Sequence, residues 1–185
     1  MIESTLADAD QKMAKATEHA RDEFAAIRTG RAHPAMFSQI VADYYGTPTP
    51  LQQLAGFQVP EPRTVIISPY DQGAKGAIEK AIRESDLGVN PSDDGKVLRV
   101  NLPELTEERR REYIKLAKTK AEDARIAVRN VRRGAKQALD KAEKASEISE
   151  DDNSAAEKRL DALTKKHIDT IDEALKAKEV ELLDV

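Results

Sequence analysis

The chain has no cysteine and no tryptophan among its 185 residues, and only 4% of its residues are aromatic. Without cysteine it forms no disulfide and offers no thiolate for catalysis or metal binding. The three histidines, His19, His33 and His167, do not have the spacing of a metal site. We therefore expect no metal and no cofactor of its own, and we expect His167 to pack in a core.

Long hydrophobic runs are also missing. No apolar segment approaches the roughly 20 residues that a membrane-spanning helix needs, and the first residues carry no signal-peptide pattern. Hydrophobic residues make up 39% of the chain and charged residues 35%, which is typical of a helix-rich protein with a thin core. We expect a cytoplasmic monomer that has no membrane partner.

Signatures of an enzyme are few. The glycines Gly73 and Gly76 flank a lysine, but no GK[ST] sequence follows, so a phosphate-binding loop is not predicted. Tyr44 and Tyr45 are candidates for stacking on bases, but alternation along a strand would bury one of the two rings, and we expect this use in the core instead. No pairing of a nucleophile with a base is evident. The sequence indicates a binding protein rather than an enzyme.

The charge of the chain is unevenly distributed. The formal net charge is −4, yet residues 107–145 carry 13 basic and 7 acidic side chains, whereas residues 146–185 carry 6 and 12. A segment of charge +6 within an acidic molecule is more informative than the total, because local potential governs the encounter with a charged partner.

The basic segment contains a one-sided stripe. Eight residues follow one another at steps of three and four, which places them on one face of an α-helix, and seven of the eight are basic. We name this set the basic stripe: Arg111, Lys115, Lys118, Glu122, Arg125, Arg129, Arg132 and Lys136. A straight cationic edge suits the phosphates of RNA, and arginine binds phosphate in a fork. Arg133 is adjacent, and Arg28 and Arg31 extend the same surface if the first two helices are antiparallel. The alternative is an ordinary solvated helix face.

Three long helices are predicted, and they form a bundle. The basic helix begins at Thr106 as N-cap, and the last helix begins at Ser149, where three acidic residues follow. The first helix ends at Thr29-Gly30. Each helix carries an apolar seam at steps of three and four. The seams are, in chain order, Ile2, Leu6, Ala9, Met13, Ala16, Ala20, Phe24 and Ile27; Ile114, Ala117, Ala121, Ala124, Val128, Val131, Ala135, Ala138 and Ala142; and Leu160, Leu163, His167, Ile171, Ala174, Lys178 and Leu182.

Residues 31–104 differ in composition, because all eight prolines of the chain lie between Pro34 and Pro103. Short apolar runs separated by turns predict four strands, at 37–45, 54–59, 64–70 and 97–102, and residues 74–85 predict one helix. The fold class is therefore α+β: a long three-helix bundle (1–30 with 105–185) and a small inserted β/α/β domain (31–104). The two crossings, near Gly30-Arg31 and near 103–106, are predicted hinges.

Five motifs make the chain resemble the bacterial ribosome recycling factor family over essentially its whole length. They lie in the order that the family shows. The motifs are Ile27-Arg28-Thr29-Gly30-Arg31-Ala32, Tyr44-Tyr45-Gly46-Thr47-Pro48-Thr49-Pro50-Leu51, Ser85-Asp86-Leu87-Gly88-Val89-Asn90-Pro91, Leu105-Thr106-Glu107-Glu108-Arg109-Arg110 and Val128-Arg129-Asn130-Val131-Arg132-Arg133.

The resemblance implies an L-shaped, two-domain molecule that binds the large ribosomal subunit and its RNA after termination. With elongation factor G, whose GTP hydrolysis is the partner's own activity, it would split the subunits and release mRNA and tRNA. Arg129 and Arg132 match the RNA-contacting arginines, and Arg28, Arg31 and Arg133 match more weakly. The resemblance places the hinge at Gly30-Arg31 and Leu105-Thr106. With Pro103 and Glu104 from the second crossing, the predicted hinge residues are Gly30, Arg31, Pro103, Glu104, Leu105 and Thr106. The alternative is an RNA-binding or coiled-coil adaptor protein of another role.

Overall fold

The computed structural model describes residues 1–184, and they form two compact units. The first unit contains Met1–Phe24 and Lys115–Glu179, and the second contains Ala25–Ile114 together with the residues from Val180 onward. These limits fall inside helices and differ from the domain limits proposed above. The predicted domain limits and hinges remain predictions. Within the described residues, no helix is long and apolar enough to cross a membrane.

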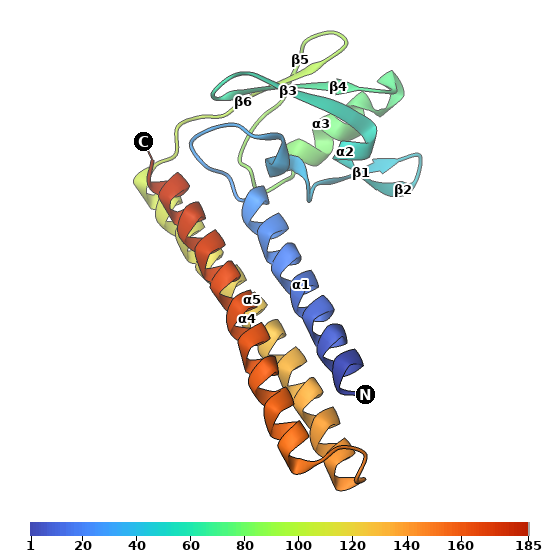
Figure 1. Ribbon diagram of the computed structural model, residues 1–185. Coiled ribbons are helices and arrows are strands. Elements are labelled where there is room, and N and C mark those ends of the chain that lie inside the picture. The colour runs from blue at the N-terminus through green and yellow to red at the C-terminus, as the bar shows by residue number, and fades with distance from the viewer. Residues whose placement is uncertain (185) are drawn as a thin grey trace. The chain divides into compact units, whose positions relative to one another are not determined.

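Three long helices build the first unit: α1 (Ile2–Ala26), α4 (Glu107–Lys144) and α5 (Glu150–Leu183). They lie side by side (Figure 1), and ion pairs join each pair of helices. Glu23 of α1 binds Lys120 of α4, and Glu3 of α1 binds Arg159 of α5. The predicted three-helix bundle is confirmed.

Small side chains on α4 let the other two helices approach closely. Ala117 and Ala121 are fully buried, and large side chains such as Met13 of α1 and Leu160 of α5 supply the bulk of the core. The seam prediction was wrong near the end of α4, where Leu139 is buried and Ala138 is exposed. A heptad allows either a three- or a four-residue step, and the larger apolar side chain takes the buried position because it gains more from burial.

A similar correction applies to α1, where Thr17 is buried and Ala16 is only partly buried. The Thr17 hydroxyl donates to the Met13 carbonyl of the preceding turn, which satisfies its polar atom inside the bundle. Helix α1 also ends at Ala26, earlier than the predicted stop at Thr29-Gly30.

The predicted starts of the two longer helices are confirmed by their caps. The backbone N–H of Arg109 donates to the Thr106 hydroxyl at 3.1 Å, and the N–H of Asp152 donates to the Ser149 hydroxyl at 3.0 Å. Both hydroxyls satisfy amide groups that have no partner within the first turn of a helix.

The second unit is built on a four-stranded antiparallel sheet of order β3-β4-β6-β5. Its strands are β3 (Ala55–Glu61), β4 (Thr64–Pro69), β5 (Ser92–Asp93) and β6 (Leu98–Asn101). A separate hairpin pairs β1 (Val41–Tyr44) with β2 (Thr47–Pro50). The helices are α2 (Leu51–Leu54) and α3 (Lys75–Arg83), with short 3-10 turns at Pro34–Phe37 and Gln72–Ala74.

The sheet and α3 enclose one apolar core. Ile78 and Ile82 of α3 are fully buried, and Ile67 of β4 and Leu98 of β6 are buried in the same cluster. Ala77 and Ala81 also pack against this cluster, so one side of α3 faces the core, and the helix predicted at 74–85 is confirmed as Lys75–Arg83.

The prediction for residues 37–45 was only partly correct. The strand begins at Val41, because Pro34 opens a 3-10 turn that ends at Phe37. Tyr45 does not serve the core: its side chain is 78% exposed, and the residue adopts a positive φ of 51° beside Gly46 at the tip of the hairpin. Tyr44 packs against the core and donates its hydroxyl to Asp71 at 2.7 Å.

Candidate nucleic-acid interface

The basic stripe lies along α4, and its side chains differ in their surroundings. Val128 and Ala135 fix the rotation of the helix, because their burial turns the stripe toward one flank of the bundle. Arg125, Arg132 and Lys136 are nearest to the core, with side chains 20%, 33% and 25% exposed. We call these three residues the inner row.

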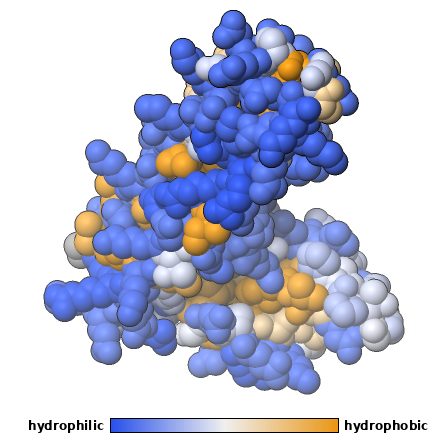
Figure 2. All heavy atoms as spheres, turned by 90° about the horizontal axis from the view of Figure 1, so that it is seen from below, coloured by the Kyte–Doolittle hydropathy of each residue, from blue (hydrophilic) through white to orange (hydrophobic). Residues whose placement is uncertain are grey.

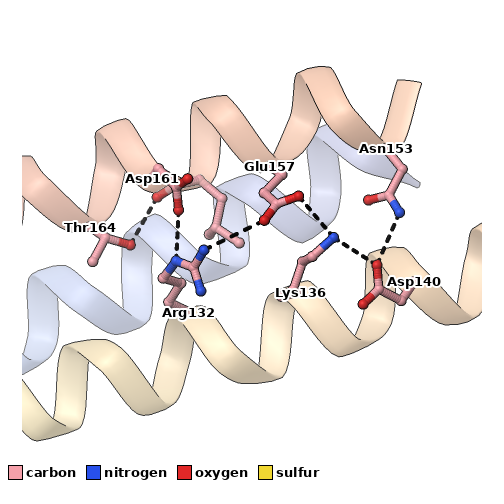
Figure 3. Close-up of polar contacts among 8 residues, drawn as sticks. Arg132, Lys136, Asp140, Asn153, Glu157, Asp161 and Thr164 are labelled. Atoms are coloured by element: carbon pink, nitrogen blue, oxygen red, sulfur yellow. Dashed lines mark hydrogen bonds and ion pairs between the residues drawn. The ribbon is translucent and has the colours of Figure 1, made fainter. Parts of the chain in front are cut away.

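The inner row is paired with carboxylates of α5. Arg125 binds Asp172 through two nitrogens at 2.6 and 2.7 Å. Figure 3 shows the neighbouring cluster, where Arg132 Nε binds Asp161 at 2.7 Å and Lys136 Nζ binds Glu157 at 3.0 Å.

The second acid on Lys136 comes from α4 itself. Lys136 Nζ also binds Asp140 at 2.8 Å, and the Asn153 side-chain amide donates to the same carboxylate at 3.0 Å (Figure 3). The inner row therefore pairs α4 with α5.

These contacts shift the pKa values of the inner row. Hydrogen bonds first to Asp140 and then to Glu157 raise the pKa of Lys136. Burial acts to lower the pKa of Arg125, but its hydrogen bonds to Asp172 and Glu122 outweigh this effect, and the pKa is raised. Both side chains are therefore firmly cationic at neutral pH.

The remaining cations of the stripe in this unit and the adjacent Arg133 point to solvent, and we call Lys115, Lys118, Arg129 and Arg133 the outer row. Arg129 is 51% exposed, and within the described residues its one acidic contact is Glu122 at 3.2 Å. The other three residues are exposed and have no ion pair within residues 1–184. The outer row can accept phosphates without breaking a contact to another helix.

Three predicted residues lie in the second unit. Arg111 is exposed and pairs with Glu107 one turn away on α4, and Arg31 is exposed. Arg28 is only 6% exposed and donates to the Pro103 carbonyl. In this conformation the Arg28 guanidinium is buried and is not accessible to a phosphate.

Arg28 has an unusual environment for a cation. Its Nε is buried without a hydrogen-bond partner, and no carboxylate within residues 1–184 binds it. Burial, and then the nearby cations Arg109 and Arg63, lower the pKa of Arg28, while Tyr113 acts in the opposite direction. Arg28 joins the segment after α1 to the segment before α4, which is a structural role that the sequence did not indicate.

His167 packs inside the bundle, as predicted. It is 7% exposed, its Nε2 lies 2.7 Å from Asp10, and its Nδ1 lies 3.4 Å from the Thr17 hydroxyl. In the part of the chain that the structure describes, no group of three or more histidine, aspartate or glutamate side chains is placed to hold a metal ion.

The sequence predicted the basic stripe but not the α5 carboxylates that pair with its inner row. The only signal in the sequence is the acidic composition of residues 146–185 beside the basic composition of residues 107–145, and opposite charges attract without specifying which side chains pair. Which carboxylate meets which cation depends on the axial register of α4 against α5, and composition does not determine this register. The face of the molecule in Figure 2 is mainly hydrophilic, as 35% charged residues lead one to expect.

The fold and this surface define a class: a helical-bundle protein with an inserted α+β unit and a cationic face along its longest helix. Residues 20–183 match the ribosome recycling factor family. The chain is 64% identical over 185 residues to the ribosome-recycling factor of Nocardioides sp. and 64% identical over 185 residues to that of Thermobifida fusca, and each comparison covers 100% of both chains. The chain belongs to the ribosome recycling factor family.

Solved structures of family members agree with the fold. A solution structure of a ribosome recycling factor matches with a TM-score of 0.77 and 45% identity, over 100% of this chain and 98% of that one. A second structure contains the T. thermophilus ribosome recycling factor with the E. coli elongation factor G, bound to the E. coli post-termination complex. Its recycling factor matches with a TM-score of 0.70 and 40% identity over 100% of both chains. The family predicted from the five motifs is confirmed.

Proposed function

We propose that this chain acts at the end of protein synthesis. It binds the post-termination ribosome and, together with elongation factor G and GTP, promotes splitting of the subunits and release of mRNA and tRNA. The observation that carries this function is the full-length identity of 64% to ribosome-recycling factors. A related factor that has been solved with elongation factor G on the post-termination complex supports the same partners.

The cationic flank of α4 is the proposed contact with large-subunit ribosomal RNA. The outer row is available as it stands, and the inner row joins it where a phosphate replaces an α5 carboxylate. Phosphate contacts of this kind position a protein on RNA and make binding depend on salt. Arg111 and Arg31 are exposed candidates for further contacts, whereas Arg28 supports the fold.

The proposed function requires no chemistry from this chain. GTP hydrolysis belongs to elongation factor G, so the chain needs no cofactor, and it acts where ribosomes are, in the cytoplasm. Its contribution is binding energy, applied through a long rigid helix.

A subunit-splitting assay tests the function. Post-termination ribosomes are incubated with the protein and matched elongation factor G and GTP, and light scattering or sedimentation reports free subunits. Splitting should require all three components. Subunits that stay joined in the complete mixture, although the protein has bound, would rule out the recycling function.

The binding surface has its own test. Arg129→Ala should weaken binding to purified large subunits by about tenfold and reduce the slope of log affinity against log salt by about 1. Arg21→Ala removes the same charge from an exposed position on α1 and is the matched control. An affinity for large subunits that changes neither with salt nor with Arg129→Ala would contradict an RNA contact through this face.

A further inference from the structure

The pairing of the inner row has a consequence for how the protein selects its RNA. Each inner cation already has an anionic partner on α5: Asp172 for Arg125, Asp161 for Arg132 and Glu157 for Lys136. A phosphate that approaches this row does not meet free cations. It competes with a carboxylate for each of them, and Figure 3 shows the carboxylates that bind Arg132 and Lys136.

The α5 carboxylates are accessible enough to be replaced. The side chains of Asp172, Asp161 and Glu157 are 48%, 53% and 38% exposed. Ion pairs at such exposure contribute little to stability, because water solvates both partners well. The same contacts nevertheless hold the guanidinium groups along the flank of α4. They are therefore weak enough to exchange for phosphate.

The charge of the two helical segments is balanced. Residues 107–145 carry 13 − 7 = +6, and residues 146–185 carry 6 − 12 = −6. At distances beyond roughly 8 to 10 Å, a polyanion in physiological salt therefore meets little net attraction from α4 and α5 together. Attraction arises only at close range, where individual phosphates reach individual cations.

We propose that the three α5 carboxylates Glu157, Asp161 and Asp172 act as an internal counter-anion row that makes the α4 surface selective for its ribosomal target over other RNA. To use the inner row, unstructured RNA must displace these carboxylates without gaining enough contacts in return. A target whose phosphates match the inner and outer rows at once replaces every lost pair and adds the outer contacts. Specificity then comes from a repulsive element as well as an attractive one. This inference rests on the proposed function.

The test uses the full-length protein and its triple variant Glu157→Gln, Asp161→Asn and Asp172→Asn. These substitutions keep the size of each side chain and one acceptor oxygen, remove the charge, and replace the second acceptor oxygen with an NH2 donor. The probes are polyuridine, as an RNA without defined structure, and purified large ribosomal subunits. Affinity is measured for both at low and at physiological salt.

We expect the triple variant to bind polyuridine about tenfold more tightly than the unsubstituted protein at low salt, with a smaller ratio at higher salt. Affinity for large subunits should change less, so the ratio of the two affinities should fall. Glu173→Gln is the charge control, since Glu173 is exposed on α5 and has no ion pair in the described chain. Its effect on polyuridine binding should stay below about twofold.

A triple variant that binds polyuridine no more tightly than Glu173→Gln would overturn the proposal. The ion pairs between α4 and α5 would then have only a structural role. Thermal unfolding of each variant shows whether the bundle is intact. If the triple variant unfolds, the same polyuridine comparison is made with the single variant Asp172→Asn. This variant should remain folded, because Arg125 keeps Glu122 as a partner. Failure of the unsubstituted protein to bind large subunits would instead reject the proposed function, so the two failures are distinguishable.

Discussion

Gly134 is a weak point in α4 at the scale of a single residue. It lies in the middle of the helix and lines a groove of about 620 Å³ between α1 and α4, together with Ala9 and Ala138. A Cβ atom at this position would meet nothing within 4 Å. We expect Gly134→Ala to stabilise the protein by about 1 kcal/mol, because alanine loses less backbone entropy in a helix. Thermal or urea unfolding measures this change.

The matched control is Gly46→Ala. Gly46 also has open space around its Cα, but it adopts a φ of +84° in the β1–β2 turn. Alanine is strained in that conformation, and this variant should be destabilised by about 1 kcal/mol. Equal shifts of the same sign at both sites would show that backbone conformation does not decide the effect.

Arg28 and Arg129 should respond in opposite ways to removal of the side chain. Arg28→Ala leaves the Pro103 carbonyl without its donor inside the second unit, which should cost about 1–3 kcal/mol of stability. Arg129 is half exposed, and Arg129→Ala should leave the unfolding temperature almost unchanged while it weakens binding to large subunits. Unfolding and binding measured on both variants separate a structural arginine from a binding one. A stable Arg28→Ala protein with impaired binding would reverse the assignment.

At the scale of elements, the sequence predicted the helices well because their signals are local. Thr106 and Ser149 cap the helices that they precede, and the three- and four-residue steps identify most buried positions. Leu139 was missed because two heptad registers fit the same segment, and only packing against the neighbouring helices separates them. The ion pairs of the inner row were missed for the same reason.

The second unit was predicted less completely. The longer strands β3, β4 and β6 carry enough apolar residues to be recognised, and α3 has a clear buried side. The two-residue strand β5 has no apolar residue, and Ser92 and Asp93 are both exposed. It is held in the sheet by its pairing with β6. Strand β2 is rich in proline and threonine, a composition that is typical of a turn, and its pairing with β1 depends on the hairpin tip.

Asp140 of α4, which accepts a hydrogen bond from Asn153 of α5, makes the stability of the contact between these two helices depend on pH. Hydrogen bonds from Lys136 and then from Asn153 lower the pKa of its carboxyl group in the folded protein. Its contribution to stability is therefore present above the unfolded-state pKa of about 3.9 and is lost as the pH falls through the lower folded-state pKa. We expect Asp140→Asn to unfold at a lower temperature than the unsubstituted protein at pH 7.

The difference between these two proteins should shrink as the pH falls below about 3.9, because protonation of the unfolded-state carboxyl then progressively offsets what the Asp140 charge contributes to the folded state. Melting temperatures from pH 7 to about pH 2.5 measure it. Asp22→Asn is the control: Asp22 is exposed on α1 and has no ion pair within the described residues. A difference that stays constant across the acidic range would show that Asp140 stabilises the connection by something other than its charge.

At the scale of the whole molecule, the net charge of −4 and the proposed RNA contact are compatible because charge is separated by segment and then compensated between helices. The bundle can be acidic in total and still offer cations at close range. For the same reason, composition alone does not indicate the family. The positive segment and the negative segment cancel in the total charge, whereas the motifs contain residues of the basic stripe itself.

The last prediction concerns the segment that follows α1, where a hinge is proposed at Gly30-Arg31. Gly30→Pro fixes the φ angle at this point, and it should leave binding to large subunits within about twofold while it slows subunit splitting by at least several-fold. The local turn should survive, since the Thr29 hydroxyl bonds to the backbone of Arg31 and not to that of Gly30. Gly30→Ala is the control, because its Cβ would lie in ordinary contact at 3.7 Å from the Asp184 carbonyl oxygen. Binding and splitting are measured on the same preparations with elongation factor G and GTP. If Gly30→Pro splits subunits as fast as Gly30→Ala, no bending at this residue is needed for recycling.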